Sequence, residues 1–397
     1  MRLTLFALAT LIASTNAFIA SITRHAESAE CTLTASGSDD APQFLNAVQT
    51  CDTVVIPASE TLEIQTRLNM TGLSNKNFNL QGTIRFKPDI DYWSGNAFFI
   101  PFQTQVTFWL LGGENIVMNG GGTLDGAGQA WYDAFVSNST LLRPITMTIF
   151  QAENVLIENI RMINSPEWHN LVNEGKNVVY SNITIHAEST SDNNPANTDG
   201  WNVYRSDNVI IKDSNIVNGD DCVAFKPNAT NVVVSNLTCS GSQSLGQFAG
   251  MFDIVRNVSV VNIRMSNAKN GARIKAWAGR NVGSGIVQNV TFKDFIVDNV
   301  DNPIVIDQCY ETDPDVCAEF PSNTFIQDIF FKNISGRASG STVADLACSP
   351  DGRCSDINVN DLELSAGSGT ATFECQNVEL EGNSANLFPE CTETGSN

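Results

Sequence analysis

Short stretches in which β-branched residues alternate with polar residues recur along the chain from about residue 110, and Asn bounds most of them. Clear copies are ENIVMNGGG at 114–122, ENVLIENIRMINS at 153–165, KNVVYSNITI at 176–185 and DNVIIKDSNI at 207–216. Looser copies follow as far as SDINVNDLEL at 355–364. The period of two and the Val and Ile content predict a short strand at each copy, with Asn and Gly at the bends.

Repeats of this length indicate a solenoid or a propeller. No helical period recurs between the strands, and no WD-type signature marks propeller blades. The pattern therefore predicts an all-β fold, a single-stranded right-handed parallel β-helix made of stacked coils. An ordinary β-sandwich is the alternative that the repeats alone leave open. Asn suits the corners of such coils because it tolerates left-handed backbone angles.

Two segments are predicted to cap the ends of this solenoid. Residues 40–50, DAPQFLNAVQT, are the best candidate for a helix, with Asp39 or Asp40 as its N-cap. This short helix would cover the first coil, and the segment from Cys348 onward would cover the last.

The first 17 residues have the form of a secretory signal peptide. Arg2 precedes an apolar run from Leu3 to Leu11, and small and polar residues lead to a cleavage site after Ala17. A membrane anchor is the alternative, but the run falls short of the ~20 residues that a membrane span needs. We therefore expect a secreted, extracellular protein without a membrane anchor, in which residues 18–397 form a single parallel β-helix domain.

The cysteine count agrees with secretion. Ten cysteines are an even number, which suits disulfides in an oxidising compartment, although spacing alone does not fix their connectivity. Pairing of sequence neighbours gives Cys31/Cys51, Cys222/Cys239, Cys309/Cys317, Cys348/Cys354 and Cys375/Cys391. A metal site is not expected, because there is no CxxC motif and the three His residues lie near no Cys.

Eight N-x-S/T sequons are candidate N-glycosylation sites, as expected for a chain that passes through the secretory pathway. They begin at Asn69, Asn138, Asn182, Asn228, Asn236, Asn257, Asn289 and Asn333.

The composition argues against one class of partner. Of the 397 residues, 22 are Lys or Arg and 43 are Asp or Glu, which gives a formal net charge of -21 at pH 7. Such a surface repels a phosphate backbone, and no Lys/Arg-rich run makes a local exception, so nucleic-acid binding is not expected. The 42% of hydrophobic and 16% of charged residues fit a globular protein, which we expect to be a monomer.

Acidic residues crowd between residues 199 and 221. NTDG at 197–200 and NGDDC at 218–222 place Asp199, Asp220 and Asp221 about one coil apart, which would stack the two motifs side by side on one face. Three carboxyl groups gathered on one surface repel one another and raise at least one pKa, which suits a pair that works as acid and base. The alternative is that these residues only decorate turns.

Two cations are predicted to project together near these carboxyl groups. GARIKAWAG at 271–279 puts Arg273 and Lys275 on the same side of a strand, because residues two apart share a face. They are candidates for a carboxylate receptor, and a bridge to a nearby Asp is the alternative. Tyr310, in IDQCY at 306–310, follows on a later coil and could equally be a packing residue.

NTDG, GDDC, RIK and a Tyr after a strand occur here in an order and spacing that resemble the polygalacturonase family, glycoside hydrolase family 28. The resemblance covers nearly the whole mature chain, from SGSDDAP at 36–42 onward. NTDGWNVYRSDN at 197–208 and DDCVAFKPNAT at 220–230 are more similar to the fungal exo-acting members than to the endo-acting ones.

The resemblance implies a pectin-lyase-like parallel β-helix that hydrolyses α-1,4-galacturonosyl links of pectin from the non-reducing end, with inversion, and releases galacturonic acid. By position, Asp220 would be the general acid, and Asp199 and Asp221 would hold and deprotonate the water. Arg273 and Lys275 would bind the galacturonate carboxylate, and Tyr310 would shape the adjacent subsite. The implied partner is a pectic polysaccharide, homogalacturonan or oligogalacturonides, and no cofactor is implied.

One segment departs from the family pattern. Relatives follow the second Cys of the 222/239 pair with a Gly-rich loop that contains a His, whereas this chain has CSGSQSLGQF at 239–248, with Gln243 where the His would be. Loss of that His removes a hydrogen-bonding partner of the acid, so we expect reduced or altered activity. His169, in NSPEWH at 164–169, lies about one coil before Asp199 and could line the same cleft, although a structural role is favoured.

Two alternatives to the leading hypothesis therefore stay open. The chain could be an exo-hydrolase of xylogalacturonan or of galacturonate-capped rhamnogalacturonan. It could also be a catalytically impaired β-helix that binds pectin, because the His-containing loop is altered.

Overall fold

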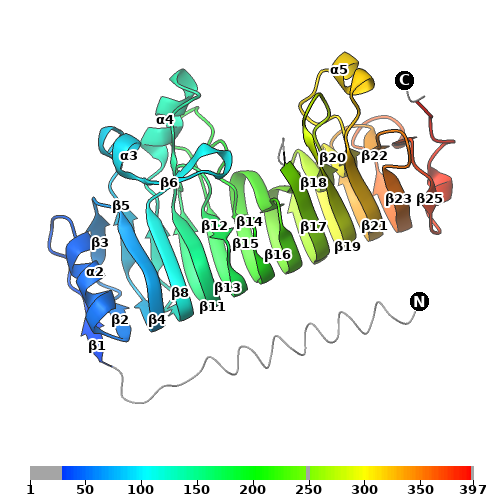
Figure 1. Cartoon of the computed structure of the whole chain (residues 1–397). Helices are drawn as coiled ribbons and strands as arrows, with labels where there is room; N and C mark the ends of the chain where they lie inside the picture. The colour runs from blue at the N-terminus through cyan, green and yellow to red at the C-terminus, as the bar shows by residue number, and fades with distance from the viewer. Residues whose placement is uncertain (1–28, 247–250, 395–397) are drawn as a thin grey trace.

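The computed structural model describes residues 29–246 and 251–394, apart from the side chains of residues 241–246 and 251. The predicted signal peptide, residues 1–17, lies outside this range. The described chain forms an elongated right-handed parallel β-helix, as the repeats predict, in which each coil stacks on the one before (Figure 1).

The strands are β1 (Glu30–Thr32), β2 (Thr53–Ile56), β3 (Thr61–Ile64), β4 (Leu68–Leu80), β5 (Thr83–Phe86), β6 (Phe98–Ile100), β7 (Gln105–Thr107), β8 (Trp109–Asn119), β9 (Thr123–Asp125), β10 (Pro144–Ile145), β11 (Met147–Ile163), β12 (Asn170–Asn173), β13 (Lys176–His186), β14 (Trp201–Tyr204), β15 (Asp207–Phe225), β16 (Ala229–Gly246), β17 (Met251–Ser266), β18 (Asn270–Lys275), β19 (Gly283–Val300), β20 (Asn302–Asp307), β21 (Thr324–Ala338), β22 (Thr342–Ala347), β23 (Cys354–Ser365), β24 (Thr372–Gln376) and β25 (Leu380–Glu381). The α-helices are α2 (Ala41–Thr50), α3 (Ile90–Asn96), α4 (Gln129–Ser137) and α5 (Pro314–Glu319), and short 3-10 helices are η1 (Phe102–Thr104) and η2 (Ala385–Leu387).

The sheet registers place the strand segments of successive coils on three faces. One of these faces, called the third face below, contains β12, β14, β18, β20, β22 and β24, together with the last residues of β15 and β16. Asn170 on β12 pairs with Trp201 on β14, and Trp201 pairs with Val223 on β15. Two residues that stand the same number of positions before paired strands of adjacent coils therefore lie beside one another. In this way the fold gathers side chains from different coils.

The interior of the coils is a continuous hydrophobic core that extends from Leu33 to Phe388. At the N-terminal end, α2 covers the first coils and inserts Phe44 against Phe78 and Trp109, with ring centroids 6.1 and 5.6 Å apart. This confirms the predicted capping helix over residues 40–50, with Asp40 at its N-cap.

Asn residues occupy the corners for the predicted reason. Asn115, Asn154, Asn177 and Asn208 all have positive φ angles, between 54 and 60°. Their side chains form a ladder in which each Nδ2 donates to the Oδ1 of the coil before it, at 2.8–3.1 Å. The left-handed backbone and the amide ladder together explain why Asn recurs at this position of the repeat.

The structure contains five disulfides, and they join the cysteines as neighbour pairing predicts. They are Cys31–Cys51, Cys222–Cys239, Cys309–Cys317, Cys348–Cys354 and Cys375–Cys391.

Long insertions project from one side of the β-helix. The segments with α3, β6 and α4 rise above the N-terminal half, and the loop with α5 rises above the C-terminal half (Figure 1). Across the described residues, no helix is long and apolar enough to cross a membrane.

Candidate active site

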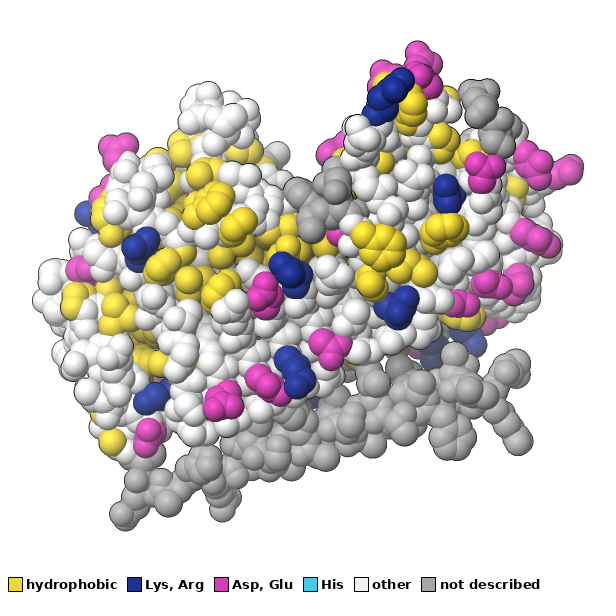
Figure 2. Space-filling view, in the orientation of Figure 1, with side chains coloured by type: hydrophobic (Ala, Val, Ile, Leu, Met, Phe, Trp, Pro, Cys, Tyr) yellow, Lys and Arg dark blue, Asp and Glu magenta, His cyan; other side chains and the backbone are white. Residues whose placement is uncertain are grey.

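A cleft of about 350 Å³ lies above the third face, and the surface is visibly hollowed between the two groups of insertions (Figure 2). Asp199, Asp220, Asp221, Arg273 and Lys275 all line this cleft. The structure thus brings together the three carboxyl groups and the two cations that the sequence singled out, although they come from different coils.

The two acidic motifs lie side by side on adjacent coils. Asp199 comes two residues before β14, and Asp220 and Asp221 belong to the part of β15 that leads to the third face. The backbones meet in a parallel bridge between Ala196 and Gly219, and Asn197 Nδ2 donates to Asp220 Oδ2 at 3.0 Å.

Gly219 makes this close approach possible. A Cβ atom at this position would lie 2.1 Å from the carbonyl oxygen of Pro195, much closer than van der Waals contact. Its backbone N–H also donates to Thr198 Oγ1 at 2.9 Å. A glycine before the Asp pair is therefore required if Asp220 is to reach the NTDG motif.

Burial and mutual repulsion favour protonation of two of the carboxyl groups. Asp199 is 3% exposed, and its burial, reinforced by the charges of Asp220 and Asp221, raises its pKa well above the ordinary value. Burial and the neighbouring Asp221 also raise the pKa of Asp220, while the hydrogen bond from Asn197 and the charge of Lys275 act in the opposite direction.

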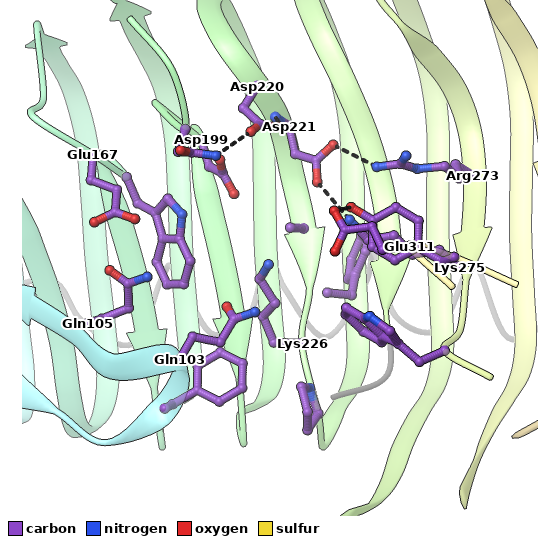
Figure 3. Close-up of a pocket in the computed structure, with 18 residues that line it drawn as sticks. Gln103, Gln105, Glu167, Asp199, Asp220, Asp221, Lys226, Arg273, Lys275 and Glu311 are labelled. Carbon is purple, nitrogen blue, oxygen red and sulfur yellow. Dashed lines mark hydrogen bonds and ion pairs between the residues drawn. The ribbon is translucent and has the colours of Figure 1, made fainter. Parts of the chain in front are cut away.

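The two cations face the third carboxyl group. Arg273 Nη2 lies 3.7 Å from Asp221 Oδ1, and Lys275 Nζ lies 3.9 Å from Asp221 Oδ2 (Figure 3). Both side chains come from β18 and share a face, as their spacing predicts. The bridge to Asp that the sequence left open therefore exists, and the cations also line the cleft. Burial lowers the pKa of Lys275.

Tyr310 closes the cleft beyond these cations. Its ring centroid lies 4.5 Å from Lys275 Nζ and 5.5 Å from Arg273 Cζ, and its hydroxyl donates to Glu311 Oε1 at 2.9 Å. Trp277 packs edge-on against the ring, with centroids 5.2 Å apart. Burial raises the pKa of Tyr310 above its ordinary value. Tyr310 thus packs against neighbours and also lines the cleft.

His169 is placed below the cleft rather than in it. It is 0% exposed, its Nδ1 lies 3.2 Å from the carbonyl oxygens of Thr198 and Asp199, and its Nε2 accepts from the Ser165 N–H at 3.5 Å. Burial lowers the pKa of His169 to about 4, which keeps the ring neutral. This geometry fits the structural role that the sequence favoured and corrects the weaker expectation of a substrate contact, because a buried ring bonded to backbone on both sides supports the Asp199 segment.

Gln243 belongs to β16, where the backbone pairs with Val223 on one side and with Ala272 on the other. Its side chain and residues 247–250 lie outside the described part of the chain. A contact between Gln243 and substrate therefore stays a prediction.

Lys226, Glu167 and Trp168 are among the cleft residues that the sequence analysis missed. Lys226 follows β15, and its Nζ lies 5.1 Å from the ring centroid of Trp168. Glu167 lies on the opposite side of Asp199 from Arg273 (Figure 3), and burial raises its pKa to about 7. The strand register would have revealed Trp168, because it stands two residues before β12, as Asp199 stands before β14.

No group of three or more His, Cys, Asp or Glu side chains among the described residues could hold a metal ion. The cleft combines carboxyl groups with cations, which suits proton transfer together with recognition of an anionic ligand.

Comparison with known proteins finds relatives that match most of the chain. The family model for glycosyl hydrolases family 28 matches residues 47–386. An exopolygalacturonase of Cochliobolus carbonum is 46% identical over 365 residues, which cover 86% of this chain and 82% of that protein. Exopolygalacturonase X of Aspergillus niger is 42% identical over the same length and covers 86% of this chain and 84% of its own.

Solved structures show the same fold. The endo-xylogalacturonan hydrolase of Aspergillus tubingensis superposes with a TM-score of 0.82 at 32% identity, covering 93% of this chain and 100% of the other. An endopolygalacturonase I of Stereum purpureum, complexed with two galacturonate molecules, has a TM-score of 0.64 at 20% identity and covers 89% and 99% of the two chains.

Proposed function

Because the chain belongs to glycosyl hydrolase family 28, we propose that it is a secreted, inverting exo-hydrolase that removes galacturonate from the non-reducing end of α-1,4-linked galacturonan. The family and its exopolygalacturonase relatives make the chain a pectin-degrading glycoside hydrolase. The observation that carries the finer proposal is one cleft in which three carboxyl groups adjoin cations suited to a uronate.

Asp220 is assigned as the general acid. Burial and the nearby Asp221 favour its protonated form, so it can hold a proton in a mildly acidic medium. It gives this proton to the bridging oxygen as the bond between that oxygen and the anomeric carbon breaks.

Asp221 and Asp199 are assigned to the attacking water. Asp221, which lies beside Arg273 and Lys275, is assigned as the base that accepts a proton from the water. Asp199, whose burial favours the neutral form, orients the same water by a hydrogen bond. The water oxygen bonds to the anomeric carbon as the leaving group departs from the opposite side, so the configuration inverts. One proton has moved to the leaving group and one to Asp221, and exchange with solvent resets both carboxyl groups.

The cations of the cleft are assigned to the carboxylates of the substrate. Arg273 and Lys275 lie on the side of the acid pair that Tyr310 closes, and Lys226 lies near Trp168 on the other side. Two adjacent galacturonate units could thus each meet a cation. Phe102, whose ring stacks on Tyr204 with centroids 3.9 Å apart, also lines the cleft.

Product analysis tests this proposal. Polygalacturonate incubated with the purified protein should yield monogalacturonate from the first minutes, while the viscosity falls slowly. A mixture of oligomers with a rapid loss of viscosity would refute the exo mode. The Asp220→Asn variant should be inactive in the same assay while it stays folded.

A second substrate is favoured by one observation. The structure with a TM-score of 0.82 is an endo-xylogalacturonan hydrolase, so the cleft shares its framework with an enzyme named for a substituted galacturonan. Product release from xylogalacturonan and from galacturonate-capped rhamnogalacturonan, measured beside polygalacturonate, separates the candidates. If pectin binds but none of the three substrates is cleaved, the protein is a pectin-binding β-helix instead.

A further inference from the structure

A buried arginine lies behind the acidic motifs. Arg143 comes directly before β10 and is 2% exposed. Its Nη1 donates to the carbonyl oxygens of Pro166, at 3.0 Å, and Ala196, at 2.6 Å, and its Nη2 donates to Asn197 Oδ1 at 2.8 Å. The guanidinium also stacks over the ring of Phe135, 3.7 Å from the centroid. Among the described residues it forms no ion pair, so its bonds go to backbone carbonyls and to one amide.

These bonds fix which way the Asn197 amide points. A guanidinium can only donate hydrogen bonds, so Asn197 must turn its oxygen toward Arg143 and its nitrogen away from it. The nitrogen then donates to Asp220 Oδ2 at 3.0 Å. The other oxygen of Asp220 accepts from the backbone N–H of Asp221 at 2.9 Å. Both oxygens of the carboxyl group are therefore held, and the side-chain bond depends on Arg143.

We propose that Arg143 is a positioning residue for the catalytic acid, because it orients the Asn197 amide so that this amide holds the Asp220 carboxyl group toward the cleft. The role of Asp220 rests on the proposed function. Arg143 itself does not line the cleft, so it acts through Asn197 and not on the substrate.

The hydrogen-bonded series Arg143–Asn197–Asp220, called the relay below, should affect a measurable quantity, the pKa of Asp220. The hydrogen bond from Asn197 stabilises the charged form of Asp220 and so opposes the rise in pKa that burial and Asp221 cause. Loss of the oriented amide should therefore raise the pKa of Asp220 further. Asp199, Asp221, Glu167, Lys226 and Lys275 also act on Asp220 or on its neighbours through their charges, and they stay unchanged in the variants below. The charge of Arg143 acts on Asp220 as well; Asn197→Leu leaves it in place, so a shift in that variant reports on the hydrogen bond from Asn197.

Two substitutions interrupt the relay at different points. Arg143→Lys keeps the positive charge but cannot make the three forked bonds at once. Asn197→Leu keeps a similar volume and removes the donor. Thr146→Val is the matched control, because it removes a buried hydrogen bond to Ser165 Oγ, 2.7 Å long, in the same region and leaves Asn197 untouched.

The first measurement needs no substrate. Infrared difference titration against Asp220→Asn reports the pKa of the Asp220 carboxyl group in each folded variant. The pKa should rise in Arg143→Lys and in Asn197→Leu, should rise no further when both changes are combined, and should stay unchanged in Thr146→Val.

The second measurement is the pH profile of hydrolysis. Misplacement of the acid should lower kcat about 10- to 100-fold with little change in KM. The alkaline limb of the pH profile of kcat should move to higher pH. A merely structural arginine would instead lower the melting temperature and leave the profile in place, as we expect for Thr146→Val.

An unchanged Asp220 pKa in folded Asn197→Leu overturns the proposal, and so do additive shifts in the double variant. If Arg143→Lys does not fold, Asn197→Leu decides alone. If the unmodified protein hydrolyses no galacturonan, the proposed function fails, whereas the infrared titration still decides whether the relay sets the state of Asp220.

Discussion

Replacing Lys226 with Met removes a cation that forms no ion pair with any described carboxylate. Its Nζ lies over Trp168, 5.1 Å from the ring centroid, and it faces the cleft from the end of β15 (Figure 3). Arg273 and Lys275 lie beside Asp221 and are assigned to a different galacturonate unit. A hydrogen bond to a charged group contributes about 1.5–3 kcal/mol. Since about 1.4 kcal/mol corresponds to a factor of ten, kcat/KM for a free uronate substrate should fall about 10- to 100-fold.

The assay compares trigalacturonate with its methyl ester by product release. The variant should lose part of the preference for the free acid, because the ester gives Lys226 no charge to bind, while Arg273 and Lys275 still favour the other free carboxylate. Lys212→Met is the matched control: Lys212 also lies on β15 but pairs with Asp213, 3.6 Å away, outside the cleft. Equal losses on both substrates, or a similar loss in the control, would refute the assignment of Lys226 to a substrate carboxylate.

Three further outcomes are expected. Gly219→Ala should lower kcat at least tenfold and reduce stability by about 1–3 kcal/mol, because the new Cβ would lie 2.1 Å from a carbonyl oxygen. Gly95→Ala is the control: its Cβ would meet no atom within 4 Å, so it should change neither kcat nor stability. Burial raises the pKa of Glu167 to about 7, so the folded state binds this proton more tightly than the unfolded chain does. The free energy of unfolding should therefore decline as the pH rises from 4.5 to 7. Calorimetry should show a weaker decline in Glu167→Gln. Glycopeptide mass spectrometry should find glycans at Asn69 and Asn138, whose Oδ1 atoms accept hydrogen bonds from the Thr hydroxyl of the same sequon. Corner residues such as Asn257, whose Nδ2 donates within the Asn ladder, should carry none. The reverse pattern would contradict this expectation.

Much of the fold follows from local patterns. The period of two predicts the strands, and Asn recurs at many corners because it tolerates the positive φ found there, so the repeat is visible in the sequence. The spacing between Asp199 and Asp220 equals one coil, so their meeting on one face could be predicted before the structure was known. Disulfides between neighbouring cysteines follow from the same short-range order.

The rest of the site depends on contacts that no local pattern encodes. Arg143 reaches Asn197 across 54 positions of sequence, from an insertion outside the repeat, so spacing carries no sign of the contact. The burial of His169 was likewise invisible, because a His one coil from a catalytic motif can point into the cleft or beneath it. Its place became clear only from the bonds of its ring to the backbone of Thr198 and Asp199.

The charge in the cleft differs from the net charge of the chain. A net charge of -21 opposes a polyanionic substrate as much as it opposes nucleic acid. The cleft resolves this conflict, because Lys226, Arg273 and Lys275 gather there. The substrate would thus meet a positive site within a negative surface, and protonation of surface carboxyl groups in an acidic medium would weaken the remaining repulsion.

The most direct test of the account follows the first product by proton NMR. Trigalacturonate is mixed with the purified protein, and the anomeric signals are recorded before mutarotation. Single displacement by Asp220, Asp199 and Asp221 predicts that the newly formed reducing end appears first as the β-anomer, and that the signal is absent with Asp220→Asn. An α-anomer as the first product, or equal cleavage by Asp220→Asn, would contradict the account.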